Sequence, residues 1–302
     1  MARGPGRVAE LLIARSGAAA LARRLRRADV VILAYHNVVP HGEPVRGDAS
    51  LHLDQRAFAE QLDRLLETHR VVALSELTPE AGPPAEAPTA VLTFDDAYAG
   101  ALTAGVEELE ARGLPATFFV CPGMLGREGF WWDLLAGPEG LAAEVREHAL
   151  WRLAGRGDDV VTWGRGHGMA VTTLAEHARP ATEALLREAA ARPGIRLGSH
   201  TWSHPNLAAL SREDAAAELA RARAWLEAGP SPAVPWIAYP YGLHSDSVVE
   251  EARAHASGAL RVEGGPARLH GRWTGAAHRL PRVNVPRGLS VEGLGLRLAG
   301  LR

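Results

Sequence analysis

Eight short apolar runs, often β-branched, alternate along the chain with stretches of helical periodicity. This alternation predicts parallel strands joined by crossover helices, hence an α/β barrel or an open doubly wound sheet. The predicted strands cover residues 30–36, 70–74, 90–95, 116–122, 195–200, 236–241, 258–262 and 279–285. The predicted helices cover residues 54–68, 98–112, 141–154, 174–191, 211–228, 245–255 and 291–301. A chain of 302 residues is long enough for one substantial core.

Metal-ligand side chains stand at the ends of two predicted strands. Asp95 and Asp96 end one, and His200 and His204 follow another. Two His at i and i+4 plus one carboxylate form the ligand set of a catalytic Zn²⁺ with an open position for water, and the second carboxylate is then free to act as a base. Taken alone, the Asp pair is more typical of a helix cap, and a chain with 13 His contains such spacings by chance.

The position of these side chains favours a barrel over an open sheet. Side chains of a regular strand alternate faces, so Asp95 and Asp96 can serve one site only where the strand ends. Candidate residues at the carboxyl ends of several strands are typical of a (β/α) barrel. We therefore expect a barrel over residues 29–302, with a helical insertion over its mouth at about 126–193.

Composition excludes several classes of protein. The net charge of −2 gives no argument for nucleic acid, and a single cysteine, Cys121, cannot form an intramolecular disulfide. No stretch approaches the roughly 18 to 20 apolar residues of a membrane span. Residues 1–28 predict a basic amphipathic helix and not a secretory signal, so we expect a cytoplasmic protein. That helix packs on the barrel or makes a peripheral contact with anionic lipid.

Three ordered motifs resemble the signatures of the NodB-homology polysaccharide deacetylases. They are Thr93-Phe94-Asp95-Asp96, Ser199-His200-Thr201-Trp202-Ser203-His204-Pro205-Asn206 and Tyr239-Pro240-Tyr241-Gly242. The resemblance covers roughly residues 30 to 285. It implies a distorted (β/α) barrel of about seven strands, a divalent metal that is usually zinc, and removal of N-acetyl groups from an amino sugar. The strand ending in His36 resembles the opening strand of a permuted branch, the exopolysaccharide N-deacetylases.

The resemblance also implies roles for individual residues. Asp96, His200 and His204 resemble the metal ligands, and Asp95 resembles the general base. The resemblance further implies that the backbone N–H of Tyr241 stabilises the oxyanion and that His36 protonates the departing amine, although His36 could instead be a core histidine at a strand end. Amide hydrolysis requires a polarising cation, an activated water, an oxyanion donor and a proton source, which this set supplies.

Two positions depart from the family pattern. Ala97 stands where a Gly commonly follows the two Asp, a change that a helix start tolerates. Ala238 replaces an Arg that orients the base in many members, and Arg282 is a candidate substitute that would hold Asp95 ionised. A structural salt bridge is the alternative for Arg282.

Aromatic residues near the motifs are candidates for sugar binding. Trp202, Trp131 and Trp132 could stack on a sugar face, and Pro240 is expected to line the same site. For Trp131 and Trp132, anchoring of the insertion in the core is the alternative.

The sequence thus predicts a metal-dependent N-deacetylase acting on an N-acetylhexosamine-containing glycan or glycan precursor. One alternative is a metal-dependent hydrolase of another amide, such as a cyclic ureide. The other is a carbohydrate-binding member of the fold without turnover. The sequence leaves open the glycan, the metal and the oligomeric state.

Overall fold

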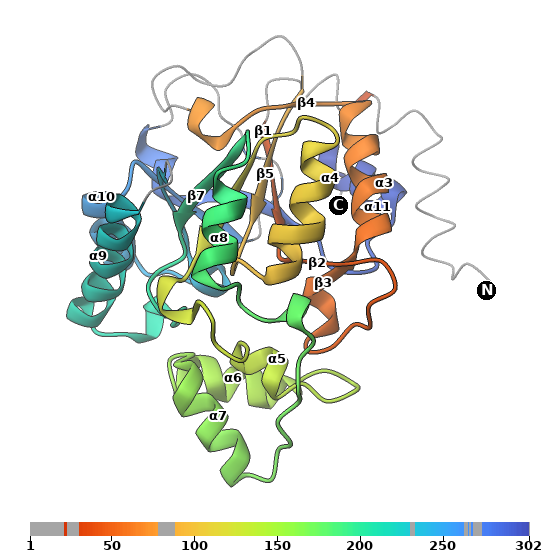
Figure 1. Cartoon of the computed structure of the whole chain (residues 1–302). Coiled ribbons are helices and arrows are strands. Elements are labelled where there is room, and N and C mark those ends of the chain that lie inside the picture. The colour runs from red at the N-terminus through yellow and green to blue at the C-terminus, as the bar shows by residue number, and fades with distance from the viewer. Residues whose placement is uncertain are drawn as a thin grey trace.

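Seven parallel strands close into a barrel within the part of the chain that the structure describes (Figure 1). The computed structural model describes residues 21–22, 30–77, 88–229, 233–262, 265, 267 and 274–301. In order around the ring, the strands are β1 (Val30–Tyr35), β5 (Thr89–Phe94), β6 (Ala116–Val120), β7 (Ile195–Ser199), β8 (Ala233–Ala238), β9 (Gly258–Val262) and β10 (Leu280–Asn284). β10 pairs with β1 and closes the ring. The predicted (β/α) barrel is therefore confirmed.

Three further strands of the described ranges lie outside the ring. The predicted strand at 70–74 is shorter, β4 (Arg70–Val71), and pairs with the first half of β5. β2 (Asn37–Val39) and β3 (His52–Asp54) form a separate parallel pair directly after β1.

Alternation along β1 divides the core into an inner and an outer part. Val30 and Ile32 belong to an inner cluster with Val91 and Phe119, whereas Leu33 belongs to the outer cluster beneath the helices. Because side chains alternate along a strand, this pattern directs the even positions of β1 and the odd positions of β5 into the barrel. His36 and Asp95 continue these two inward series.

Helices cover the outside of the ring (Figure 1). They are α3 (Gln55–Leu66), α4 (Val106–Glu110), α8 (Glu183–Ala190), α9 (Arg212–Ala228), α10 (Asp246–His255) and α11 (Val291–Leu298). The side chains of Thr182, Ser211, Ser245 and Ser290 cap the last four of these by accepting a backbone N–H in the first turn.

Two predicted helices differ from the structure. The predicted helix at 174–191 is an α-helix only at α8, because Pro180 lacks an N–H and disfavours helical backbone in the residue before it. The predicted helix at 98–112 contains a π-helical turn, η3 (Ala101–Gly105), before α4.

The segment between β6 and β7 carries three additional helices, α5 (Trp131–Leu134), α6 (Ala143–Trp151) and α7 (Gly157–Gly166). They gather beyond the end of the barrel at which β2 and β3 lie (Figure 1). That end carries the carboxyl ends of the strands, since β2 directly follows β1.

Most of the predicted helix at residues 1–28 lies outside the described residues. Leu21 and Ala22 are helical, and Ala22 packs against Leu296 and Ala299 at the end of α11. No helix in the described ranges is long and apolar enough to cross a membrane.

Candidate functional site

The ladder between β1 and β5 places His36 beside Asp95. Tyr35 is in register with Phe94, and the Tyr35 carbonyl accepts a hydrogen bond from the Asp95 N–H at 3.0 Å. His36 and Asp95 are the residues directly after this pair, so they follow the ends of two neighbouring strands at the same level. His36 is half-buried and close enough for its charge to act on both Asp95 and Asp96.

Arg282 reaches Asp95 through the barrel interior. The guanidinium of Arg282 donates two hydrogen bonds to the Asp95 carboxylate, at 2.7 and 2.6 Å, and a third to Thr93 Oγ1 at 3.1 Å. Both side chains are buried, Arg282 completely. A bidentate, charge-assisted pair of this kind fixes the carboxylate in orientation as well as in charge.

Unusual backbone conformations bring the motif side chains together. In the described residues, six non-glycine residues have a positive φ. Four of them lie in the three motifs, namely Asp96, Thr201, His204 and Tyr241, and a fifth, Ala97, directly follows the first motif. A left-handed turn after β5 breaks the alternation of the strand, so Asp95 and Asp96 can face the same site. Such residues cost about 1 kcal/mol or more each and are concentrated at functional sites.

The sequence predicted that Ala97 lies at the start of a helix, but Ala97 lies in a turn. Its φ of +52° places it in the left-handed region, which glycine adopts without a steric penalty. Glycine at this position would adopt this conformation without strain, whereas Ala97 adopts it with a steric penalty.

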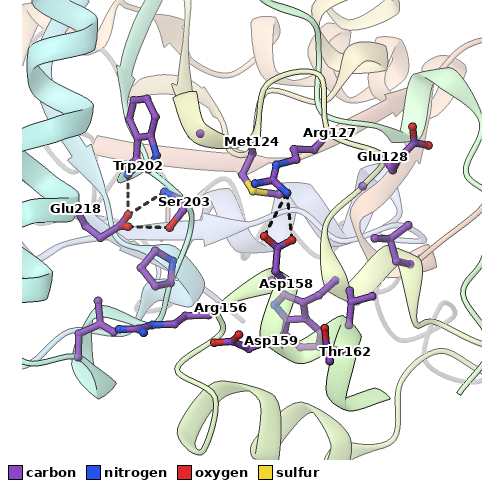
Figure 2. Close-up of a pocket in the computed structure, with 18 of the residues that line it drawn as sticks. Met124, Arg127, Glu128, Arg156, Asp158, Asp159, Thr162, Trp202, Ser203 and Glu218 are labelled. Atoms are coloured by element: carbon purple, nitrogen blue, oxygen red, sulfur yellow. Dashed lines mark hydrogen bonds and ion pairs between the residues drawn. The ribbon is translucent and has the colours of Figure 1, made fainter. Parts of the chain in front are cut away.

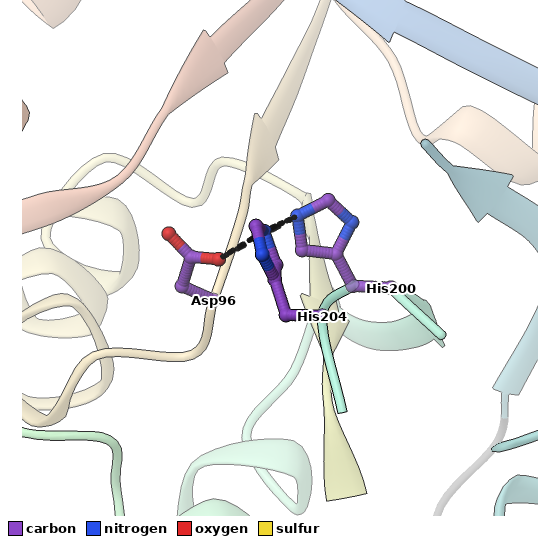
Figure 3. A group of neighbouring side chains, drawn as sticks. All are labelled: Asp96, His200 and His204. Carbon is purple, nitrogen blue, oxygen red and sulfur yellow. Dashed lines mark hydrogen bonds and ion pairs between the residues drawn. The ribbon is translucent and has the colours of Figure 1, made fainter. Parts of the chain in front are cut away.

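Asp96, His200 and His204 converge on one point (Figure 3). The Asp96 Oδ1 atom lies 3.5 Å from His200 Nε2 and 3.2 Å from His204 Nε2, and the two Nε2 atoms are 3.1 Å apart. Asp96 Oδ1 is buried and has no hydrogen-bond partner among the described residues. A buried carboxylate oxygen facing two imidazole nitrogens is the donor set of a divalent cation such as Zn²⁺, so these residues fit a metal.

The hydrogen bond of His200 determines which of its nitrogens faces the site. His200 Nδ1–H donates to the carbonyl of Ala238 at 2.7 Å, which leaves the lone pair on Nε2. Burial lowers the pKa of His200 to about 4, against the opposing charge of Asp95. His200 is therefore neutral near pH 7, as a metal ligand must be.

Both carboxylates are ionised in this site. Burial acts to raise the pKa of Asp95, but the charge of the Arg282 guanidinium and its two hydrogen bonds outweigh burial and hold that pKa well below its usual range. Burial likewise acts to raise the pKa of Asp96, and the His204 imidazole that faces its carboxylate outweighs burial, so that pKa is lowered. Asp95 lies farther from the imidazoles, with its Oδ2 atom 4.0 Å from His200 Nε2.

Tyr241 lies against His204 and belongs to a short 3₁₀ turn, η7 (Pro240–Gly242), in which Pro240 is buried. The Tyr241 ring is nearly perpendicular to the His204 ring, with centroids 4.5 Å apart. Its hydroxyl donates to the His204 carbonyl at 3.3 Å and accepts from Trp131 Nε1 at 2.8 Å.

Trp131 and Trp132 are buried, which favours the alternative that they anchor the insertion in the core. They are 2% and 3% exposed, and Trp131 also contributes to the lining of the groove beside Trp202. Trp132 packs against His204, with centroids 4.8 Å apart.

Trp202 lines a groove of about 800 Å³ (Figure 2). The guanidinium carbon of Arg221 lies 3.7 Å from the centroid of the Trp202 ring. The groove separates α7 from α9 and is spanned by the ion pairs Arg127–Asp158, at 3.1 Å, and Arg156–Asp214, at 3.2 Å. Ser203 and Pro205 line it as well, so the groove adjoins the loop that carries His204.

Two residues that hold this loop were not predicted as site residues from the sequence. Glu218 on α9 accepts hydrogen bonds from the backbone N–H groups of Trp202 and Ser203, at 3.0 and 2.8 Å. Asn206 donates to the Leu150 carbonyl at 3.0 Å and so ties the loop to α6. Asn206 ends the histidine motif and could have been found there, whereas nothing in the sequence connects Glu218 with a loop 15 residues earlier.

A closed parallel barrel with carboxylates and imidazoles at the carboxyl ends of its strands has the organisation of a barrel enzyme. Residues 82–257 match the family model for polysaccharide deacetylase. This match covers more than half of the 302 residues, and the chain belongs to the polysaccharide deacetylase family. The family and the enzyme class predicted from the sequence are thereby confirmed. No curated protein sequence matches the chain.

Solved structures of deacetylases share the fold. The Streptococcus pyogenes deacetylase PplD, in complex with acetate, is 17% identical with a TM-score of 0.62, over 90% of this chain and 99% of that one. IcaB from Ammonifex degensii is 21% identical with a TM-score of 0.61, over 90% and 97% of the two chains. The BpsB deacetylase domain from Bordetella bronchiseptica is 17% identical with a TM-score of 0.56, over 86% and 97%.

Proposed function

We propose that this protein is a metal-dependent N-deacetylase that hydrolyses the N-acetyl group of an N-acetylhexosamine unit in a glycan or glycan precursor. The observation that carries the proposal is the convergence of Asp96, His200 and His204 on one point, with a second ionised carboxylate beside them. Membership in the polysaccharide deacetylase family supports the same activity.

Asp96, His200 and His204 would hold the metal, most simply Zn²⁺. When bound, the metal supplies Lewis-acid polarisation of the amide carbonyl and of a water molecule. Asp95 accepts the proton of the attacking water, and Arg282 holds the carboxylate in the orientation this requires. The water oxygen bonds to the acetyl carbon, the C–N bond breaks, and acetate and a free amine result.

The remaining roles fall to His36 and Tyr241. His36 follows the strand that neighbours the strand of Asp95, which supports its role as the acid that protonates the departing amine. The backbone N–H of Tyr241 donates to the developing oxyanion, and the left-handed conformation of Tyr241 gives that N–H a fixed direction. Pro240 restricts the same turn.

The groove beside the His204 loop offers room for neighbouring sugar units of a glycan chain. We expect oligomers of N-acetylglucosamine to be hydrolysed with a lower KM than the monosaccharide. Replacement of Trp202 by Ala should raise KM for the oligomers and leave the monosaccharide unaffected. Equal KM values for oligomer and monosaccharide would contradict a role for the groove.

The proposed activity is tested by measuring metal content and acetate release on the same samples. Plasma mass spectrometry of wild-type protein should give about one divalent metal per chain, and acetate should be released from N-acetylglucosamine oligomers. His200→Ala should lose both. The matched control is His255→Ala on α10, whose histidine pairs with Glu251 at 3.4 Å and should be dispensable for both.

Other results would point to the alternatives. Metal without acetate release would favour hydrolysis of another amide. A protein that binds no metal when zinc is supplied, but still binds the glycan, would contradict catalysis and favour a binding module.

A further inference from the structure

The two histidines of the proposed metal site are held in different ways. His200 Nδ1–H donates to the Ala238 carbonyl, the usual means by which a metal-binding imidazole is oriented. His204 Nδ1 is buried without a hydrogen-bond partner in the described part of the chain. Something other than a hydrogen bond must therefore set the orientation of the His204 ring.

Aromatic rings surround His204 instead. Their centroids lie 4.5 Å (Tyr241), 4.8 Å (Trp132) and 5.8 Å (Phe130) from the centroid of His204. Tyr241 and Phe130 pack edge to face on the imidazole. Packing of this kind restricts rotation of the ring only if the packing side chains are themselves fixed.

Trp132 is fixed by a buried chain of hydrogen bonds. Trp132 Nε1–H donates to the Tyr98 hydroxyl at 2.9 Å, and that hydroxyl donates to Asp133 Oδ2 at 2.6 Å. Asp133 is completely buried, and its Oδ1 atom accepts from the Asp48 N–H at 2.8 Å and from His52 Nε2 at 3.0 Å. These bonds fix the Asp133 carboxylate to the segment around β3. The Tyr98 hydroxyl joins Trp132 to that carboxylate, so the indole of Trp132 is held in place as well.

We propose that Trp132, Tyr98 and Asp133 are positioning residues that orient His204 for metal binding. This inference rests on the proposed function, because it takes His204 as a metal ligand. Loss of a group that orients a metal ligand typically weakens metal affinity by about 10- to 100-fold. Tyr98→Phe keeps the ring and removes only the hydroxyl that links Trp132 to Asp133, so we expect metal affinity about tenfold weaker.

The test is a titration of the metal-free full chain with Co²⁺, followed by its visible absorption. Tyr98→Phe should bind Co²⁺ about tenfold more weakly than wild type, with an altered absorption band that reports changed ligand geometry. Trp132→Phe, which keeps an aromatic ring but loses the indole N–H, is the second variant and should behave in the same way. Thermal unfolding of each metal-free variant establishes that it is folded.

Tyr35→Phe is the matched control. It makes the same chemical change at a buried tyrosine whose hydroxyl has no hydrogen-bond partner within the described residues, so Co²⁺ affinity should equal that of wild type. Folded Tyr98→Phe and Trp132→Phe variants with wild-type affinity and band would overturn this inference alone. Wild-type protein that bound no Co²⁺ would overturn the proposed metal site and this inference with it.

Discussion

Arg282 and Asp95 form a buried ion pair, so removal of either side chain leaves the other charge buried without its partner. We expect Arg282→Met to lower the free energy of unfolding by about 3–5 kcal/mol, because it leaves the buried Asp95 carboxylate without its partner. Chemical denaturation of the two proteins measures this difference. Acetate release should be lost as well, because the carboxylate loses both bonds that orient it.

The double variant Arg282→Met, Asp95→Asn separates these two effects. It removes the unpaired charge, so it should recover a large part of the lost stability while remaining inactive. A double variant no more stable than Arg282→Met would show that the arginine acts through something other than this ion pair.

His177 makes the stability of the fold depend on pH in the mildly acidic range. Its Nε2 lies 3.1 Å from the Pro44 carbonyl, to which it donates, and its Nδ1 accepts from Asn37 at 3.3 Å. Burial lowers the pKa of His177 below the ordinary 6.5. The unfolded chain therefore takes up this proton more readily, and the stability that His177 contributes is complete above about pH 6.5 and decreases as the pH falls through its folded pKa.

Replacement of His177 by Gln should remove this dependence. The free energy of unfolding of wild type should exceed that of the variant at pH 7.5, and the difference should decrease as the pH falls below about 6.5. Parallel pH profiles for the two proteins would contradict a role for this histidine.

At the scale of the elements, the backbone just before η3 passes so close to β2 that only glycine fits there without a clash. A Cβ on Gly100, just before η3, would lie 2.3 Å from the Val38 carbonyl oxygen and 2.6 Å from Asn37 Oδ1. Neither β2 nor the buried Asn37 can move freely, so Gly100→Ala should destabilise the protein by about 2 kcal/mol or more. Thermal unfolding checks this value.

Gly166 provides a control with the opposite sign. A Cβ there meets nothing within 4 Å, and the residue lies in the last turn of α7 without a positive φ. Gly166→Ala should therefore be neutral or stabilising by up to about 1 kcal/mol, since alanine has the higher helix propensity. A Gly100→Ala variant as stable as wild type would mean that the clash at Gly100 is relieved at little cost.

On the scale of the whole molecule, features that depend on strand periodicity were predictable from the sequence, whereas features that depend on distant contacts were not. The seven strands of the ring and the approach of Asp95, Asp96, His200 and His204 result from apolar runs that end in polar residues. The burial of Trp131 and Trp132 could not be read from the chain, because the helices that cover them occupy an insertion without strand periodicity. Equally, no local pattern indicated that the partners of Asp133 are Tyr98 and His52.

Metal binding should couple the two halves of the chain, because its proposed ligands come from the ends of β5 and β7. A ligand that binds only the folded state stabilises it by about 2.7 kcal/mol at 100 times its Kd, which for a chain of this size corresponds to roughly 5 °C in Tm. We expect Zn²⁺ at that excess to raise the Tm of the chelator-treated protein by this amount, and renewed chelation to reverse the rise. His204→Ala should show no such shift, because the remaining Asp96 and His200 do not complete the ligand set. If Zn²⁺ raised the Tm of His204→Ala as much as that of wild type, the stabilising metal would lie elsewhere on the molecule.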